Sequence, residues 1–200
     1  RPGVSRTTPD NEPGARRAPQ LPIPETWISL FTTKNLKPRL PKKSKKSIFE
    51  KIGLDKNKKL VVYFSEGLSE TEEGGLSHSI FGAMKELDIN FVVKLHPKEY
   101  GNKKTFYENL AKNIGIKVKV IKDINIFELI NILDLGIVMH SNTGMEISML
   151  KKPLLVVNVT GKEDVFPYVK EGIALGAYNQ KEIAPKIKEL LENQTTKNKL

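Results

Sequence analysis

From about residue 60 to the C-terminus, the chain carries short apolar segments of strand length, and most of them lack polar residues at alternate positions. Continuous apolar runs of this kind are typical of strands that are covered on both faces. Six segments have this character and are predicted to form strands: residues 60–65, 91–95, 116–121, 135–139, 154–158 and 173–177.

Segments with helical spacing of apolar residues separate the predicted strands. In one of them Phe106, Leu110 and Ile114 share a helix face. Strand alternating with helix six times predicts an α/β fold, a doubly wound six-stranded parallel sheet of Rossmann-like type. The predicted helices cover residues 47–52, 76–87, 103–114, 126–133, 142–150 and 179–192, with a shorter one over 163–170 that a proline interrupts.

Residues with known preferences for helix ends stand at several of these boundaries. Gly53 follows the first predicted helix and is expected to end it. Asn125 or Asp123 is expected to cap the helix over residues 126–133, because short polar side chains accept hydrogen bonds from the first free N–H groups.

The N-terminal part has a different composition, since eight of the twelve prolines fall in residues 1–41. Proline removes hydrogen-bond donors and interrupts helices, so this part is not expected to form a compact core. Residues 1–46 are therefore predicted to be a disordered or linker segment, and residues 47–200 a nucleotide-sugar-binding Rossmann-like domain. Within the linker, the lysine cluster at residues 42–46 fits a solvated charge run better than a phosphate- or membrane-binding patch.

The formal net charge of +10 is confined to the first 60 residues, which hold 15 Lys and Arg against 5 Asp and Glu. Residues 61–200 hold 18 of each kind and no Arg. Because a duplex-binding domain carries its basic patch on a folded face, no nucleic-acid partner is expected. The chain has no cysteine, no apolar run of membrane length and no leader-like start. These features predict a cytoplasmic protein in a reducing compartment.

Two polar loops are predicted to meet where a ligand would bind. In a doubly wound sheet, ligands lie outside the carboxyl ends of the strands, at the point where the strand order reverses. With the order 3-2-1-4-5-6 that point lies between the first and fourth strands. The loops that follow these strands are residues 66–75 and residues 140–144.

Residues 140–153 carry the strongest chemical signal. Ser141 can cap the following helix, and Asn142, Thr143 and Gly144 stand at or near its first turn. The N–H groups there favour an anion, and a glycine lets a phosphate approach the backbone. Glu146 could accept hydrogen bonds from ribose or sugar hydroxyls. The alternative is a capped helix with a packing glycine and a glutamate that faces solvent.

Three further positions at strand ends are candidates. His96 and Pro97 directly follow the second strand, where a histidine can donate to a phosphate or transfer a proton. A histidine that bonds only to backbone groups is an equal alternative. Ser65 and Gly67 follow the first strand and are weaker candidates for ligand contact. The three histidines lack metal-ligand spacing, so neither a metal nor another cofactor is expected.

Several well-known motifs are absent from the sequence. It contains no GxGxxG after the first strand and no GxxxxGK[ST], which disfavours a nicotinamide-dependent enzyme and a P-loop ATPase. It also contains no GxSxG, which disfavours a serine hydrolase of the α/β-hydrolase type.

A strand ending in His-Pro, then a strand ending in Ser-x-Thr-Gly-x-Glu, then a helix ending in Lys-Pro resembles the C-terminal half of GT-B enzymes. The similarity extends over residues 60–192 and is greatest to capsule and teichoic-acid transferases, such as polysialyltransferases and CDP-glycerol transferases. UDP-N-acetylglucosamine 2-epimerases share the architecture. The resemblance implies that His96, Ser141, Thr143 and Gly144 contact the donor's phosphates and that Glu146 holds the ribose. Asn142 stands where the family often has Ser or Thr.

The resemblance implies a donor-binding half, for a nucleotide-sugar or CDP-linked donor, with His96 as the catalytic residue. In GT-B enzymes the acceptor binds on an N-terminal Rossmann domain, for which residues 1–46 are too short. The chain is therefore expected to act with such a domain or a partner chain and to be inactive alone. Two alternatives stay open: an epimerase half, which the lack of Arg in residues 61–200 disfavours, and a non-enzymatic binding module. The basic linker could also contact an anionic inner membrane surface.

Overall fold

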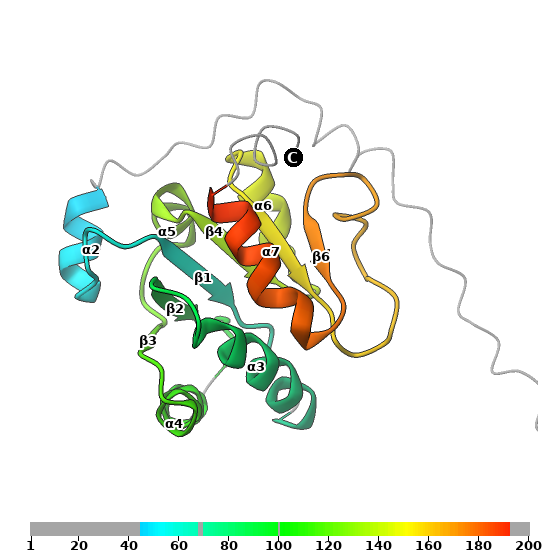
Figure 1. Ribbon diagram of the computed structural model, residues 1–200. Coiled ribbons are helices and arrows are strands. Elements are labelled where there is room, and N and C mark those ends of the chain that lie inside the picture. The colour runs from blue at the N-terminus through cyan, green and yellow to red at the C-terminus, as the bar shows by residue number, and fades with distance from the viewer. Residues whose placement is uncertain (1–44, 68–69, 100, 193–200) are drawn as a thin grey trace, which may run out of the picture. The chain divides into compact units, whose positions relative to one another are not determined.

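Six parallel strands form one sheet in the order β3-β2-β1-β4-β5-β6 (Figure 1). The computed structural model describes residues 45–67, 70–99 and 101–192, which all belong to one unit, Lys34–Leu200. The predicted linker over residues 1–46 lies almost entirely outside the described residues. The strands are β1 (Leu60–Phe64), β2 (Asn90–Lys94), β3 (Lys119–Ile121), β4 (Leu135–Val138), β5 (Leu154–Val157) and β6 (Leu175–Ala177). The predicted fold class is confirmed, and the strand order is the one that was assumed to place the ligand site.

The four central strands are buried along their whole length, as their continuous apolar sequences predicted. Strand β1 lies at the centre and pairs in parallel with both β2 and β4. The edge strands β3 and β6 each have three residues and are shorter than the predicted segments. An edge strand pairs with one neighbour only, and the ladder from β2 to β3 covers just three residue pairs.

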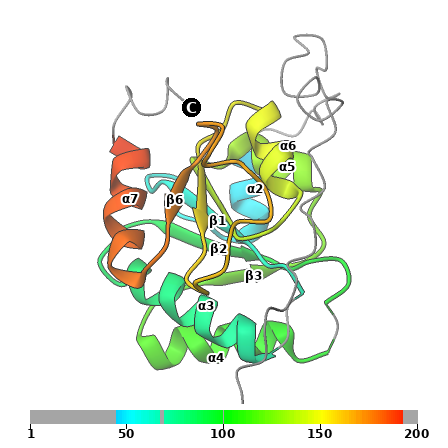
Figure 2. The same ribbon diagram turned by 90° about the vertical axis from the view of Figure 1, so that its right-hand side faces the viewer.

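Helices cover both faces of the sheet. Figure 2 shows α3, α4 and α7 on one side and α2, α5 and α6 on the other. Their apolar sides supply the core, and α3, α4 and α7 pack in one cluster against the strands. The helices are α2 (Lys45–Ile52), α3 (Glu70–Met84), α4 (Lys103–Ile114), α5 (Ile126–Ile132), α6 (Thr143–Met149) and α7 (Gln180–Glu192).

The largest differences from the predicted helices occur in two places. Helix α3 begins six residues before the predicted start and runs through Gly74 and Gly75, which lie in the segment predicted as a loop. The predicted helix over residues 163–170 is wrong, since the structure has turns and bends there. Pro167 has no N–H to donate within a helix, and the segment instead buries Tyr168 against Gly144 at the start of α6.

None of the helices in the described ranges combines the length and the apolar character that crossing a bilayer requires.

Candidate functional site

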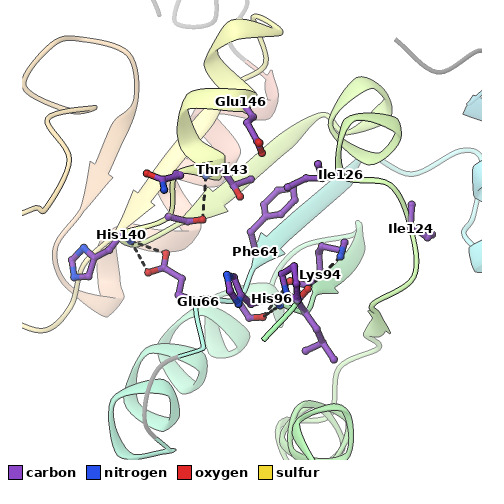
Figure 3. Close-up of a pocket in the computed structure, with 14 residues that line it drawn as sticks. Phe64, Glu66, Lys94, His96, Ile124, Ile126, His140, Thr143 and Glu146 are labelled. Atoms are coloured by element: carbon purple, nitrogen blue, oxygen red, sulfur yellow. Dashed lines mark hydrogen bonds between the residues drawn. The ribbon is translucent and has the colours of Figure 1, made fainter. Parts of the chain in front are cut away.

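A cavity of about 680 Å³ opens at the carboxyl ends of β1, β2 and β4 (Figure 3). It lies at the reversal of strand order between β1 and β4, where the sequence placed the site. Its volume is in the range of small-molecule sites. The lining residues are Phe64, Ser65, Glu66, Lys94, Leu95, His96, Pro97, Ile124, Ile126, His140, Ser141, Asn142, Thr143 and Glu146.

Seven of the nine predicted site residues line this cavity, although they come from three separate parts of the chain. These seven are Ser65, His96, Pro97, Ser141, Asn142, Thr143 and Glu146. The two glycines, Gly67 and Gly144, are not among the lining residues. Gly67 adopts a left-handed backbone conformation, and Gly144 packs against Tyr168.

His96 holds its ring in a defined orientation at the end of β2. Its Nδ1 atom lies 3.1 Å from the backbone N of Lys98, which donates to it. A neutral imidazole with an acceptor at Nδ1 carries its proton at Nε2. His96 therefore offers the cavity one N–H donor, which suits the oxygen of a phosphate.

Ser65 is occupied by a network that joins β1 to β2. Its hydroxyl accepts from the backbone N of His96 at 3.0 Å and donates to the carboxylate of Glu99. The same carboxylate accepts from the backbone N of His96 at 2.8 Å. Both Ser65 and Glu99 are buried. Ser65 thus fixes the backbone on which His96 stands, and its hydroxyl has little capacity left for a ligand.

Gly67 allows the loop after β1 to pass close to the histidine. Its φ angle of +67° lies in the left-handed region, which strains any residue with a side chain. A Cβ atom there would stand 3.8 Å from His96 Nδ1. The glycine therefore positions the loop beside His96, outside the cavity wall.

Glu66 joins the two loops of the switch point, a role that the sequence reasoning missed. Its Oε1 accepts from the backbone N of Met139 and of His140, both at 2.6 Å, and its Oε2 accepts from His140 N at 2.8 Å. Hydrogen bonds to a charged acceptor are about twice as strong as neutral ones. The carboxylate therefore holds the end of β4 against the end of β1 and occupies two donors that an anion could otherwise use.

The start of α6 is built by local hydrogen bonds. Ser141 Oγ accepts from the backbone N of Thr143 at 3.2 Å, and its carbonyl accepts from the Tyr168 hydroxyl at 3.1 Å. A Cβ atom on Gly144 would lie 2.6 Å from the Tyr168 ring, which is closer than side chains tolerate. Glycine is thus required at residue 144 for packing against the tyrosine, the alternative that the sequence left open.

Glu146 projects from the first turn of α6 toward the cavity (Figure 3). Burial raises the pKa of this carboxyl group above its usual value. Its Oε2 atom is buried and has no hydrogen-bond partner within the described part of the chain. A carboxylate oxygen in this condition can accept a hydrogen bond from a ligand hydroxyl.

Lys94 is the second residue that the sequence reasoning missed. It ends β2, is only 8% exposed, and lines the cavity. Its ammonium donates to the carbonyl oxygens of Lys122 at 2.8 Å and Leu95 at 3.2 Å. Burial lowers the pKa of Lys94, and Asp123 partly opposes that shift. The only sequence signal was one lysine inside an apolar strand, and a buried lysine is rare unless it is paired.

The remaining wall of the cavity is apolar. Phe64 and Leu95 come from the ends of β1 and β2, and Ile124 and Ile126 come from the loop before α5 and its first residue. The site thus combines apolar surface with N–H donors and a carboxylate. Within the ranges that the structure covers, no three His, Asp or Glu side chains gather as metal ligands.

The solved structures that match this fold include glycosyltransferases and epimerases. A glycosyltransferase from Rickettsia africae matches with a TM-score of 0.60 and 18% identity, over 86% of this chain and 47% of its own. The UDP-GlcNAc 2-epimerase from Neisseria meningitidis, solved with UDP-GlcNAc, matches with a TM-score of 0.59 and 16% identity, over 88% and 46%. The wall teichoic acid polymerase TagF matches with a TM-score of 0.54 and 17% identity, over 77% and 38%.

At these identities the comparisons show a shared fold, and they confirm the GT-B resemblance at that level. The chain spans less than half of the length of each of these three proteins. No protein-family model and no curated protein sequence matches the chain.

Proposed function

We propose that the cavity binds the nucleotide part of an activated donor and that the chain is the donor-binding half of a GT-B transferase in surface polysaccharide synthesis. The donor would be a nucleotide-sugar or a CDP-polyol. The observation that carries the proposal is the meeting of His96, Lys94, Thr143 and Glu146 around one cavity at the switch point. Structures of the same fold whose names include UDP-GlcNAc or CDPG support it.

In this proposal each wall of the cavity takes a different part of the donor. The apolar surface of Phe64, Ile124 and Ile126 suits a flat base. The ammonium group of Lys94 and the Nε2–H of His96 are donors that suit the phosphates. The oxygen of Glu146 that has no partner among the described residues suits a ribose hydroxyl.

The chemical role follows from where charge develops. When the bond between the phosphate and the sugar or polyol carbon breaks, negative charge grows on the departing phosphate oxygen. The Nε2–H of His96 would donate to that oxygen, and fixed donors of this kind stabilise a transition state without reorganisation. The acceptor would bind on an N-terminal domain or a partner chain. That domain or chain would also supply the base that activates the acceptor.

An epimerase half is the second candidate, because epimerases match the fold about as well as transferases do. Both enzymes would hold the nucleotide in the same place. The identity of the base that binds and the fate of the sugar separate them.

The first test is calorimetric titration of the chain with CMP, CDP, UDP and UDP-N-acetylglucosamine. Replacing His96 or Glu146 by Ala should each weaken binding by about tenfold or more, since a hydrogen bond to a charged group contributes roughly 1.5–3 kcal/mol. Exposed counterparts serve as controls: His78→Ala on α3 and Glu108→Ala on α4 should leave the affinity unchanged.

Binding of a cytidine nucleotide that both cavity variants weaken supports a transferase with a CMP- or CDP-linked donor. Binding of uridine ligands alone moves the proposal to an epimerase or a UDP-sugar transferase. If the folded chain binds none of the four at millimolar concentration, the non-enzymatic alternative stands in its place.

A further inference from the structure

Beside the donor cavity, the open edge of the sheet carries a concentration of lysines. Strand β3 lies at this edge, near α2 and α4 (Figure 1). Two further cavities, of about 380 and 260 Å³, follow the edge. Their walls contain two acidic residues, Asp55 and Asp123, against six lysines: Lys51, Lys58, Lys104, Lys117, Lys119 and Lys122.

This imbalance is local, because residues 47–200 hold 22 lysines (4 before residue 61 and 18 after it) against 20 Asp and Glu (2 before and 18 after). Lys58 pairs with Asp88, and Lys104 pairs with Glu108. Lys51, Lys117 and Lys119 are exposed and form no ion pair with another described residue. The edge therefore keeps an excess of positive charge in a domain whose overall charge is nearly balanced.

Protection of an edge strand explains only part of the cluster. Lysines on an edge strand discourage pairing with another chain, which accounts for Lys117 and Lys119. Lys51 belongs to α2 and Lys104 to α4, so they add charge from both sides of the strand. Lys119 also turns toward the end of α2, where a Cβ on Gly53 would lie 3.7 Å from its Nζ atom.

The three cavities form a series. Lys119 lines both edge cavities, while Leu95 and Ile124 line both the nearer edge cavity and the donor cavity. A long ligand that follows the lysines is thus led to the place where the donor would bind. The concave, lysine-lined walls suit separate anionic groups on a narrow chain better than they suit a flat membrane surface.

We propose that this edge binds a linear polyanion whose repeating phosphate or carboxylate groups contact the lysines. The polyanion site is independent of the donor cavity, because Lys51, Lys117 and Lys119 do not line that cavity.

The test uses the full chain and two double variants that each remove two exposed lysines. Lys51→Gln with Lys119→Gln changes the edge, and Lys181→Gln with Lys188→Gln changes α7 as a matched control. Short linear polyphosphate and polyglutamate are titrated at several salt concentrations, so that phosphate and carboxylate polymers are compared. The basic N-terminal segment is the same in both variants and cancels from the comparison.

For at least one polymer, the edge variant should lower the slope of log affinity against log salt by about two, one for each lost lysine contact. The control variant should keep the wild-type slope, and nucleotide affinity should be equal in all three proteins. Equal slopes for the two variants would overturn the polyanion site. Anionic vesicles and single-stranded DNA are then added as competitors. If either displaces both polymers as effectively as the polymers displace each other, the choice of partner is wrong.

The two proposals can fail separately. If the wild-type chain binds no nucleotide, the donor site is contradicted while the edge site stays in place. Equal salt slopes contradict the edge site while leaving the donor site in place.

Discussion

Glu146 combines a partly buried carboxylate with an oxygen that has no hydrogen-bond partner. Burial raises the pKa of this group, so the folded state disfavours the ionised form more than the unfolded state does. A raised carboxyl pKa therefore lowers stability above the unfolded value of about 4.5, and this cost disappears as the carboxyl group becomes protonated at lower pH.

Replacing Glu146 by Gln should thus increase the free energy of unfolding at pH 7 while weakening nucleotide binding. The gain should shrink as the pH falls toward 4, because the wild-type group is then largely neutral. Urea unfolding at the two pH values checks this. A gain of the same size at both would mean that the carboxylate is not the source of the cost.

Gly144 offers a second prediction at the level of one residue. Alanine there would place a methyl group 2.6 Å from the Tyr168 ring. Overpacking of this kind costs about 1–3 kcal/mol, so Gly144→Ala should lower the urea midpoint. Gly75→Ala is the matched control, because nothing lies within 4 Å of that position and alanine in a helix gains about 0.5–1 kcal/mol. If both variants gain stability, packing against Tyr168 is not the reason that residue 144 is glycine.

The residues that the sequence located and those it missed differ in a physical way. His96, Thr143 and Glu146 could be found because each stands at or just after a strand end, and a parallel sheet brings these ends together. Glu66 and Glu99 act through hydrogen bonds to distant backbone or side-chain groups. No local pattern contains such partners, so the roles of these two carboxylates appear only in the folded structure.

At the level of elements, the starts of both α5 and α6 border the cavity wall. The two helices differ in how their first turns are capped. Asn125 caps α5, since its Oδ1 accepts from the backbone N of Phe127 at 2.9 Å and of Glu128 at 3.2 Å. This bears out one of the two capping residues that the sequence left open. Asn142 stands at the corresponding position of α6 but makes no side-chain capping bond.

Asn125→Ala should therefore destabilise the domain by about 0.5–2 kcal/mol, the range that loss of an N-cap costs. Asn142→Ala should change stability by much less. Thermal unfolding followed by circular dichroism compares the two variants under the same conditions. Equal losses would show that the capping bond at Asn125 contributes nothing beyond the general effect of removing an asparagine.

Element lengths were the weakest part of the sequence-based prediction. The ends of β3 and β6 depend on how far a single neighbour extends beside them. The turns over residues 163–170 depend on Tyr168 reaching the carbonyl of Ser141, 27 positions away. In each case a distant partner decides the outcome, which local propensity cannot represent.

At the scale of the whole molecule, the strand order assumed from the sequence is the one that the structure has, and short right-handed crossovers leave few other parallel topologies. That order alone placed the cavity between β1 and β4. The chemical identity of the ligand does not follow from topology, since one fold supports many functions. It requires the side chains at the cavity, and so it is best tested by a ligand's effect on the whole domain.

The cavity is built from β1, β2, β4 and their loops, so a ligand that binds there should stabilise the domain as one unit. At a nucleotide concentration 100 times its Kd, the gain is about 2.7 kcal/mol. Each kcal/mol raises Tm by about 2–4 °C for a domain of this size, so a rise of roughly 5–11 °C is expected. His96→Ala at the same nucleotide concentration should show a clearly smaller rise, while His78→Ala should match the wild type. A rise that is the same in all three proteins would place the nucleotide outside the cavity, because His96 Nε2 would then make no contact with it.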